Sequence, residues 1–596
     1  MEVKRTFDLL GRYHELYLQK PDALAGKENG QWVKWSAKDY IEQSEWTSYG
    51  FLALGLKKGD MVATISNNRP EWNIVDMALS QAGVVNVPIY PTISKEEYDY
   101  ILNHAQPKFV IVSDKLLYAK IKPIVSGAPS IKDIYTFDEV EDAKNWKEIR
   151  ELGKKNAGEL KERLTDIKAS ILPDDLVTLL YTSGTTGFPK GVMLSHNNLV
   201  SNFITTATVH HLNHNHRVLS FLPISHVYER MANYHFQYKG LSIYYAENMG
   251  TILQDLKDVK PHVFSSVPRL LEKVYDKIIG KGKDLPFLKK QIFFWAVNLG
   301  MHYNPHKSSL YYASRLKIAR KLIFSKWKEA LGNNVEIIVS GGAALQARLA
   351  TIFWAADMKV LEGYGLTETS PVISITNLAT MEIKFGTVGP VIDGVEVKIA
   401  EDGEILCKGP NLMLGYYKAP ELTAEVIDKD GWFHTGDIGV FEDGKYLKIT
   451  DRKKEIFKLN SGKYIAPQVI ENKLKESFFI ENLMVIGENE KFASALISPN
   501  YEFLHNWAGM HGIKFRDNQD LISNPQTVSR IQKEVNDMNK NLGLTEQIKR
   551  FRLVVEEWTP ATGELSPTLK LKRKVLTEKY QNLIEDIYSV DKGGVD

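Results

Sequence analysis

Strand-like and helix-like patterns alternate through the first part of the chain, and this alternation restricts the fold more than any other feature. The apolar run Met61 to Ile65 (MVATI) predicts a buried strand, and the periodic run behind Pro70 predicts a helix that ends at Gly83. A strand, a helix and a strand are then predicted at Val84 to Ile89, Glu96 to Ala105 and Phe109 to Val112. Strands separated by helices form a mostly parallel, helix-covered sheet, so we predict an α/β fold.

Two further strands and a change of character divide the chain. Leu176 to Tyr181 and Val335 to Val339 read as strands that run directly into Gly-rich turns, where α/β sheets place their ligand sites. After about residue 386, Asp-Gly turns separate short strand patterns, which indicates a β-rich subdomain over about 386–450. We therefore predict a large N-terminal domain over 1–452 and a smaller α+β C-terminal domain over 453–596.

Composition excludes several classes of protein. The 596 residues include 75 Lys and Arg against 73 Asp and Glu, so we expect no nucleic-acid partner that is bound through global charge. Cys407 is the single cysteine, which excludes a disulfide framework within the chain. Glu2 and Asp8 interrupt the apolar region that a signal peptide needs, and no run approaches the ~18 to 20 apolar residues of a membrane span. We expect a cytoplasmic protein, or one peripheral to the inner face of a membrane.

The most informative segment is YTSGTTGFPKG, Tyr181 to Gly191, directly after a predicted strand. Its glycines let backbone N–H groups approach a ligand, its hydroxyls can donate, and Lys190 adds a positive charge, which together suit phosphate oxygens. Gly184 and Gly187 are too close together for the usual P-loop. From composition alone, a surface loop rich in turn residues is an equal alternative.

This segment resembles the signature of the adenylate-forming superfamily, which includes acyl-CoA synthetases, nonribosomal adenylation domains and luciferases. The resemblance continues in order through most of the chain, in FLPISHVYER (221–230), PHVFSSVPRLLEKV (261–274), SGGAAL (340–345), EGYGLTETSP (362–371), GTVGP (386–390), GWFHTGD (431–437), DRKKEIFK (451–458) and LSPTLKLKRK (565–574). FLPISHVYER and LSPTLKLKRK look most like long-chain fatty-acid CoA ligases.

The resemblance implies a two-step reaction with ATP and CoA as co-substrates and Mg²⁺ as cofactor. A fatty-acid carboxylate would attack the α-phosphorus of ATP to give acyl-AMP and pyrophosphate, and the CoA thiol would then displace AMP. The anhydride supplies a good leaving group, so the protein mainly positions the reactants and neutralises charge on phosphate oxygens.

Residue roles follow from the resemblance. Glu368 would carry Mg²⁺, with Thr186 as a second candidate; Thr367 would contact the α-phosphate or the carboxylate, and His226 would lie near the carboxylate or shape the acyl pocket. A structural histidine is the alternative for His226. ATP or AMP would contact Thr182, Ser183, Gly184, Thr185, Thr186, Gly187, Lys190, Gly341, Gly342, Ala343, Glu362, Gly363, Tyr364, Gly365, Thr367, Asp437 and Arg452. Among these, Tyr364 would stack on adenine, and Asp437 and Arg452 would bind ribose.

In the family, the C-terminal domain is a mobile lid that rotates between the two half-reactions. The hinge would be Lys454, and Lys458 and Gly462 would face CoA in the second pose. Lys570 would be the catalytic lysine that bridges the carboxylate and α-phosphate during adenylation. Many relatives carry Gly before this lysine where this chain has Leu569, so Lys572 remains the alternative.

Other readings stay open. The substrate could be a medium-chain, aryl or amino acid, or the protein could be a silent nucleotide- or acyl-binding protein; a luciferase-like oxygenase would use the same adenylation site. Acyl chain length, oligomeric state and regulation are not readable from these residues. Residues 281–328 interleave bases with aromatics around a single acid, Asp284. They predict either a contact with anionic lipid or an ordinary solvated face over buried aromatics.

Overall fold

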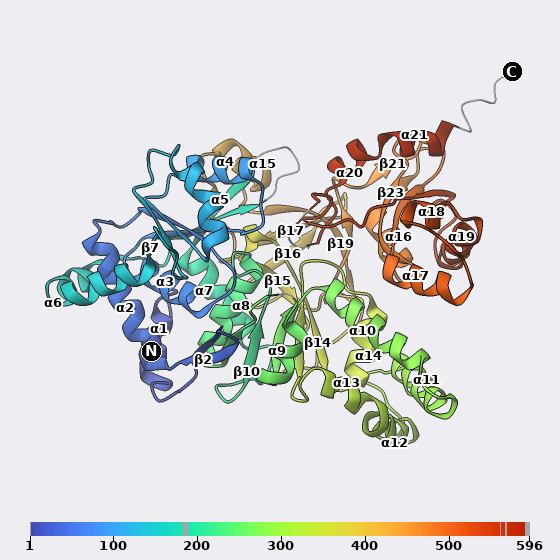
Figure 1. Cartoon of the computed structure of the whole chain (residues 1–596), viewed down its shortest axis with the longest axis horizontal. Coiled ribbons are helices and arrows are strands. Elements are labelled where there is room, and N and C mark those ends of the chain that lie inside the picture. The colour runs from blue at the N-terminus through green and yellow to red at the C-terminus, as the bar shows by residue number, and fades with distance from the viewer. Residues whose placement is uncertain (1, 183–188, 249, 561, 567–568, 590–596) are drawn as a thin grey trace. The chain divides into compact units, whose positions relative to one another are not determined.

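The computed structural model describes residues 2–182, 189–248, 250–560, 562–566 and 569–589 (Figure 1). Its internal contacts divide the chain into two units. Unit 1 comprises Met1–Lys398, Leu406–His434 and Glu442–Leu447, and unit 2 comprises Ile399–Ile405, Thr435–Phe441 and Lys448–Asp596. The α/β class predicted from the sequence is confirmed, with a large N-terminal region and a smaller C-terminal one. The boundary predicted at residue 452 stays a prediction.

Unit 1 contains two eight-stranded sheets. The strand order of the first is β15 (Val372–Ile375), β14 (Lys359–Gly365), β13 (Ile337–Ser340), β12 (Val263–Ser266), β10 (Arg217–Ser220), β11 (Ser242–Tyr245), β1 (Leu24–Glu28) and β2 (Gln31–Trp35). The order of the second is β18 (Gly415–Tyr416), β9 (Lys190–Ser195), β8 (Leu176–Thr182), β4 (Val85–Ile89), β3 (Met61–Ile65), β5 (Phe109–Val112), β6 (Asp133–Thr136) and β7 (Lys144–Asn145). Pairing is parallel from β14 to β1 and from β8 to β7, and antiparallel at the edges.

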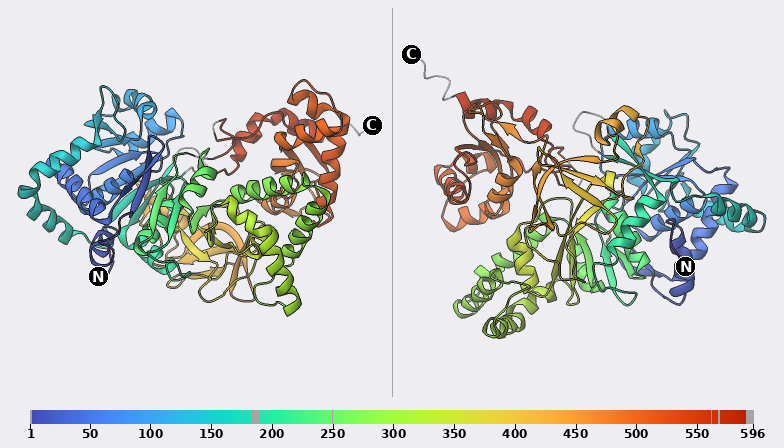
Figure 2. Two further views of the ribbon diagram at one scale, coloured as in Figure 1. Left: turned by 60° about the horizontal axis from the view of Figure 1, so that its bottom comes forward. Right: turned by 180° about the vertical axis from the view of Figure 1, so that it is seen from behind.

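Helices connect and cover these sheets, as Figures 1 and 2 show. Those of unit 1 are α1 (Asp8–Leu16), α2 (Ala37–Ala53), α3 (Pro70–Gln81), α4 (Lys95–Ala105), α5 (Lys115–Val125), α6 (Trp146–Ser170), α7 (His196–Thr206), α8 (Val227–Tyr238), α9 (Ile252–Val259), α10 (Pro268–Lys283), α11 (Phe287–Met301), α12 (Leu310–Ala319), α13 (Ser325–Ala330), α14 (Ala347–Ala355) and α15 (Pro420–Val426). The long helices α2 and α6 lie side by side at an outer edge of the unit.

The local chemistry explains the elements that the sequence predicts. All five side chains of β3 are buried, as expected for a strand with both faces covered. Pro70 occupies the first turn of α3, where its missing N–H costs nothing, and Gly83 follows the helix at φ +68°. The core around β3, β4 and β5 is completed by apolar side chains of α4 and α5.

A four-stranded sheet contains the points where the chain passes between the units. Its order is β16 (Glu396–Ile399), β17 (Glu404–Lys408), β19 (Phe433–Glu442) and β20 (Tyr446–Arg452). Asp443 and Gly444 both have positive φ, at +50° and +67°, as a two-residue hairpin turn requires. The Asp-Gly turns seen in the sequence therefore do connect short strands.

Unit 2 is built on a three-stranded sheet with its own apolar core. The sheet contains β23 (Ile480–Ile486), β24 (Ser494–Pro499) and β25 (Arg550–Leu553), and a separate hairpin pairs β21 (Phe457–Lys458) with β22 (Tyr464–Ile465). The helices are α16 (Pro467–Leu474), α17 (Tyr501–Met510), α18 (Asn518–Ser523), α19 (Pro525–Asn539), α20 (Arg573–Lys579) and α21 (Gln581–Ser589). Across the described residues of both units, no helix is long and apolar enough to span a bilayer.

Candidate active site

The predicted nucleotide residues gather at the ends of two neighbouring strands of unit 1. β13 and β14 pair in parallel with Ser340 opposite Glu362, so both strands end at one edge of the sheet. Gly341 follows β13 directly, and a Cβ built there would lie 3.5 Å from the Gly363 oxygen. The turn after β13 and the end of β14 are therefore adjacent, as expected for residues that share one ligand.

Gly365 is required by a close backbone approach. A Cβ at this position would lie 1.6 Å from the Pro371 oxygen, because the chain folds back from β14 into β15. Residues Gly363 to Glu368 are half-buried, whereas Glu362 before them and Thr369 after them are buried. The segment GYGLTE thus forms an accessible lip held between buried ends, and this lip includes Tyr364 and Thr367.

Glu362 is a buried carboxyl group at the base of this lip. Burial raises its pKa to about 8, and a hydrogen bond from the Gly386 backbone only partly opposes that rise. The carboxyl group is therefore mostly protonated at neutral pH, and it can donate a hydrogen bond. Its own backbone N–H donates to Thr376 Oγ1 at 3.3 Å, which fixes the strand end.

Glu368 forms the polar centre of the lip together with two residues from the second sheet. Tyr416 of β18 donates its hydroxyl proton to Glu368 Oε1 at 2.8 Å, and the Lys190 ammonium lies 4.9 Å from the centre of the Tyr416 ring. The backbone N–H of Met413 also donates to the backbone carbonyl oxygen of Glu368 at 2.9 Å. Burial, and then the charge of Glu368, raises the pKa of Tyr416, so the phenol stays a donor.

Tyr416 was not identified by sequence reasoning. It reaches Glu368 because β18 pairs antiparallel with β9, with Tyr416 opposite Val192, and β9 starts at Lys190. The Lys190 ammonium therefore lies near the Tyr416 ring, whose hydroxyl contacts Glu368. The roles of Lys190 as a phosphate ligand and Glu368 as a metal ligand stay predictions. Thr182 ends β8 opposite Lys190, whereas Ser183, Gly184, Thr185, Thr186 and Gly187 lie outside the described residues.

His226 is the N-cap residue of α8. It precedes α8, and its Nδ1 accepts the Tyr228 backbone N–H at 3.2 Å, so a neutral ring carries its proton on Nε2. Tyr228, which sequence reasoning also missed, donates to the Val339 oxygen at 3.0 Å, and its ring lies 3.5 Å from the Cβ position of Gly341. One aromatic side chain of FLPISHVYER, Tyr228, therefore lies next to the end of β13.

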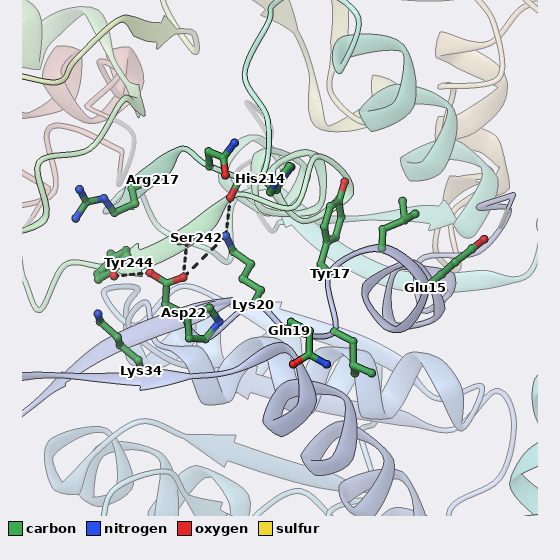
Figure 3. Close-up of a pocket in the computed structure, with 14 residues that line it drawn as sticks. Glu15, Tyr17, Gln19, Lys20, Asp22, Lys34, His214, Arg217, Ser242 and Tyr244 are labelled. Atoms are coloured by element: carbon green, nitrogen blue, oxygen red, sulfur yellow. Dashed lines mark hydrogen bonds and ion pairs between the residues drawn. The ribbon is translucent and has the colours of Figure 1, made fainter.

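A surface hollow lies elsewhere in unit 1 (Figure 3). Its volume is about 600 Å³, and no predicted site residue lines it. Asp22 accepts hydrogen bonds there from Ser242 and Tyr244, both at 2.9 Å, and Lys20 donates to the His214 oxygen at 2.7 Å. These polar groups of the hollow are therefore hydrogen-bonded to one another.

In unit 2, the two predicted ribose ligands are in contact. Arg452 Nε lies 3.2 Å from Asp437 Oδ1, and Asp437 is buried while Arg452 is partly exposed. The next residue, Lys453, pairs with Asp402 at 2.6 Å and with Glu404 at 2.8 Å. Lys454 is exposed, and the structure gives its side chain no ion pair or hydrogen bond with the described residues. The chain is thus tied down before the predicted hinge residue.

The predicted CoA-side residues occupy the hairpin β21–β22. Gly462 has φ +83° in its turn, which favours glycine, and a Cβ there would lie 3.8 Å from Lys458 Cε. The Lys458 ammonium lies 5.6 Å from the centre of the exposed Tyr464 ring. Both predicted residues are therefore on one small exposed hairpin.

Lys570 lies on an exposed turn. Its backbone N–H donates to Ser566 Oγ at 3.0 Å, and its carbonyl oxygen accepts the Ser566 N–H at 2.8 Å. Leu569 before it has φ +62°, a left-handed conformation in which glycine has no steric cost. Lys572 instead precedes α20 and donates its backbone N–H to the Glu564 oxygen at 2.8 Å.

Comparison with known proteins identifies the class. Residues 17–417 match the AMP-binding enzyme family, and residues 454–592 match the AMP-binding enzyme C-terminal domain. The chain therefore belongs to the AMP-binding enzyme family, and the predicted resemblance is confirmed.

The similar proteins refine this class. The chain is 32% identical over 579 residues to the long-chain-fatty-acid–CoA ligase FadD15 of Mycobacterium bovis, covering 94% of this chain and 93% of that protein. It is also 32% identical to human long-chain-fatty-acid–CoA ligase 1, covering 96% of this chain and 84% of that protein. The adenylation domain of a Mycobacterium chelonae carboxylate reductase has the same fold, with a TM-score of 0.73 at 23% identity over 98% of this chain and 91% of that one.

Proposed function

We propose that the protein is an AMP-forming ligase that activates long-chain fatty acids to acyl-CoA through an acyl-adenylate. The observation that carries this proposal is the similarity along nearly the whole chain to proteins named long-chain-fatty-acid–CoA ligases. The group of Glu368, Tyr416 and Lys190 supports it, because an adenylating enzyme needs a carboxylate and a cation beside a ligand-accessible strand end.

Unit 1 performs the binding part of this mechanism. Gly341, Gly342 and Ala343 admit the nucleotide at the sheet edge, Tyr364 stacks on adenine, and Lys190 neutralises phosphate charge together with residues of 182–187. Thr367 donates to the α-phosphate or the carboxylate. The attack of a carboxylate oxygen on the α-phosphorus forms the P–O bond of acyl-AMP and breaks the bond to pyrophosphate, which leaves with its charge. His226 borders the acyl pocket rather than moving a proton.

Glu368 would hold Mg²⁺, and its surroundings suit that ion. Glu368 Oε1 accepts one hydrogen bond from Tyr416, and Oε2 has no hydrogen-bond partner among the described residues. One hard carboxylate oxygen is therefore available to a cation. Those residues contain no cluster of three His, Cys, Asp or Glu, and Mg²⁺ in ATP sites takes most of its ligands from water and phosphate. When bound, the ion neutralises phosphate charge; Thr186 is a second candidate ligand.

Unit 2 would supply the remaining groups. Asp437 and Arg452 bind the ribose hydroxyls, and Lys570 contributes its cation while the adenylate forms. Rotation about Lys454 then removes Lys570 and brings Lys458 and Gly462 toward CoA, whose thiolate attacks the acyl carbon and releases AMP. The exposed position of Lys454, after the paired residues Arg452 and Lys453, supports the hinge assignment. The proposal places the protein in the cytoplasm, in peripheral contact with a membrane through residues 281–328.

A carboxylate panel tests the proposal. Acetate, octanoate, palmitate, oleate, benzoate and amino acids are supplied with ATP and Mg²⁺, with and without CoA, and both AMP and thioester are measured. We expect CoA-dependent thioester from palmitate and oleate above all others. AMP formed only with aryl or amino acids would overturn the substrate class, and absence of pyrophosphate exchange with every acid would favour a silent binding protein.

A further inference from the structure

A buried ion pair lies in the interior of unit 1, outside the candidate active site. The Arg230 side chain of α8 is fully buried and that of Asp76 on α3 is 2% exposed, and Arg230 Nη2 donates to Asp76 Oδ1 at 2.6 Å. Such a pair adds little net stability, because the cost of taking both charges out of water offsets most of their attraction. What it does supply is a defined geometry, since hydrogen bonds from a guanidinium group are directional.

The guanidinium group of Arg230 contacts three elements at once. Besides the bond from Nη2 to Asp76, Nη1 donates to Thr178 Oγ1 on β8, and Nε donates to the Tyr234 hydroxyl of α8 at 3.1 Å. Tyr234 in turn donates to Asp76 Oδ2. A guanidinium group presents five N–H donors in fixed directions, which the single ammonium of a lysine cannot reproduce. Strand β8 and helices α3 and α8 are therefore held in one arrangement.

Thr178 connects this guanidinium group to the second sheet. Its hydroxyl donates to the Asn86 carbonyl oxygen of β4 at 2.8 Å, and the Asn86 side chain donates to Asp76 Oδ1 at 2.7 Å. Asn86 and Thr178 are register partners in the parallel pairing of β4 with β8, and both are buried. Strand β8 is thus fixed to α8 four residues before Thr182, where the strand ends and the Gly-rich segment begins.

The residue before Arg230 is bonded to the other sheet. Ser220 of β10 donates to Glu229 Oε1 at 2.5 Å, and the Asn233 side chain donates to the Glu229 carbonyl oxygen at 2.9 Å. Tyr245 of β11 donates to Asn233 Oδ1 at 2.7 Å. Consecutive residues of FLPISHVYER therefore attach α8 to β10 of the first sheet and to β8 of the second.

The first turn of α8 lies at the edge of the first sheet that carries the predicted nucleotide residues. Arg230 belongs to this turn, because its backbone N–H donates to the oxygen of the N-cap residue His226 at 3.1 Å. Tyr228 of the same turn lies against the Cβ position of Gly341, as described above. The bond from Arg230 to β8 therefore connects this edge with the strand that leads into the Gly-rich segment.

A second contact attaches the start of α8 to the second sheet. Asn68 follows β3 by three residues, and its side chain donates to the Leu222 oxygen at 2.6 Å and accepts the Ile224 N–H at 2.9 Å. Leu222 and Ile224 belong to the loop between β10 and α8. The helix start is thus fixed to the second sheet both before His226, through Asn68, and after it, through Arg230.

ATP would have to contact both sheets at once in the proposed mechanism. Its adenine would lie at the edge formed by Gly341 and Tyr364, on β13 and β14 of the first sheet, while its phosphates would meet Lys190 and the residues that follow Thr182, on β9 and β8 of the second. The separation of these two groups depends on how the sheets are held together. AMP lacks the β- and γ-phosphates and would need the second group less.

We propose that Arg230 is a positioning residue that sets the separation between the nucleotide edge of the first sheet and the end of β8. The proposal deepens the proposed function and rests on it only in taking ATP as the ligand; it requires no particular acid. Weakening the contact between Arg230 and Thr178 should therefore lower the affinity for ATP more than the affinity for AMP.

Thr178→Val tests this contact and leaves the ion pair in place. The substitution removes the hydroxyl and keeps a branched side chain of similar size. Equilibrium dialysis of the full chain with ATP or AMP, in the presence of Mg²⁺, measures the two dissociation constants. We expect the Kd for ATP to rise on the order of tenfold, as for other partners that orient a ligand-binding group, and the Kd for AMP to stay close to that of the parent. Pyrophosphate exchange should slow by about 10²-fold, the cost of a misplacement of about 1 Å.

Two variants serve as controls. Thr178→Ser retains the hydroxyl and should restore both ATP affinity and exchange. Thr136→Val makes the same change in β6 of the second sheet, where buried Thr136 donates to the Lys144 oxygen at 3.2 Å. Urea unfolding should show similar losses of stability in the two valine variants. An unchanged ratio of ATP to AMP affinity in Thr178→Val, or an equal change in Thr136→Val, would overturn the proposal.

Arg230→Lys tests the same role from the other side of the contact. It keeps a cation beside Asp76 but loses the fixed directions of the guanidinium group, so it should resemble Thr178→Val in its ratio of ATP to AMP affinity. Parent-like affinities for both nucleotides would contradict the proposal. If the lysine variant does not fold, Thr178→Val still provides the test, because it leaves the ion pair intact.

Nucleotide binding separates this proposal from the function on which it rests. Selective loss of ATP affinity in Thr178→Val, with no pyrophosphate exchange by the parent for any acid, would support the positioning role and overturn the proposed function. Normal exchange by the parent, with an unchanged ratio of affinities in Thr178→Val, would do the reverse. A parent protein that binds neither nucleotide would overturn both.

Discussion

The functional groups of unit 1 and unit 2 are held in opposite ways. Glu368 is half-buried and fixed by Tyr416, on a strand pairing that also places Lys190. Lys570 lies on an exposed turn, and its backbone is hydrogen-bonded to Ser566. In the proposed mechanism, unit 1 supplies preorganised electrostatics, while unit 2 supplies a cation that enters and leaves. Substitutions in the two units should then differ in which half-reaction they affect.

The largest effect is expected for Lys570→Ala. Removing a cation aimed at charge that develops during adenylation should lower the rate of ATP–pyrophosphate exchange by about 10² to 10³-fold. Thioester formation from preformed acyl-AMP and CoA should be unchanged, because in the proposed mechanism Lys570 leaves the site before CoA attacks. Lys572→Ala is the matched control, with a small effect on either reaction. An equal loss of both half-reactions in Lys570→Ala would break the comparison between the units.

A smaller loss is expected when the fixed group in unit 1 is altered. Tyr416→Phe removes the hydrogen bond to the Glu368 carboxylate. This loss should lower the rate of pyrophosphate exchange by about tenfold. Glu368→Gln should cost more and should raise the Mg²⁺ concentration needed for half-maximal pyrophosphate exchange. Tyr417→Phe, at the neighbouring position, is the control. A Tyr416→Phe enzyme with unchanged Mg²⁺ dependence and unchanged rate would show that the Glu368 carboxylate needs no positioning.

Glu362→Gln tests the buried carboxyl group through pH. Burial raises the pKa of Glu362 from its ordinary value of 4.5 to about 8, so the folded state favours the protonated form. The stability that this preference adds is complete below pH 4.5 and is lost as pH rises through 8. The amide cannot ionise, so the variant should match the parent near pH 4.5 and should be more stable above pH 8. Thermal unfolding from pH 5 to 9 measures this, and parallel curves would contradict it.

Much of the fold was predictable because its signals are local. The buried run MVATI, Pro70 and Gly83 fix a strand, a helix start and a helix stop without reference to the rest of the chain. Tyr416 was not predictable, since its contact with Glu368 depends on the pairing of β18 with β9 far along the sequence. Local patterns carry no information about which distant strand becomes a neighbour.

The aromatic side chains of residues 281–328 also show what local sequence patterns cannot predict, in this case which side chains of one helix are buried. Phe293 is buried and Phe287 is exposed, although both lie on α11 among similar residues. Which face of a helix is covered depends on where its neighbours pack, in this case α14 and α12. The sequence therefore predicts a helix rich in bases and aromatics, and only the tertiary structure separates the surface side chains from the core.

The smallest effect is expected for Leu569→Gly, on the free energy of unfolding. This substitution sharpens the comparison between the two units, because it changes the turn that carries Lys570. A leucine at φ +62° costs about 1 to 2 kcal/mol relative to a right-handed conformation, and its side chain is 39% exposed, so little packing offsets that cost. Leu569→Gly removes the strain but adds freedom to the unfolded chain, leaving a net gain of about 0.5 kcal/mol. Leu569→Ala keeps a Cβ and should gain nothing, which makes it the control.

Urea unfolding of the full chain measures both Leu569 variants, and pyrophosphate exchange is measured alongside. We expect exchange to be unchanged, because glycine allows the same turn and Lys570 keeps its backbone hydrogen bonds to Ser566. A more stable protein that adenylates normally would show that this turn only has to present its lysine. A glycine variant that loses exchange while gaining stability would show instead that the left-handed leucine restricts the approach of Lys570, and unit 2 would then be preorganised in the same sense as unit 1.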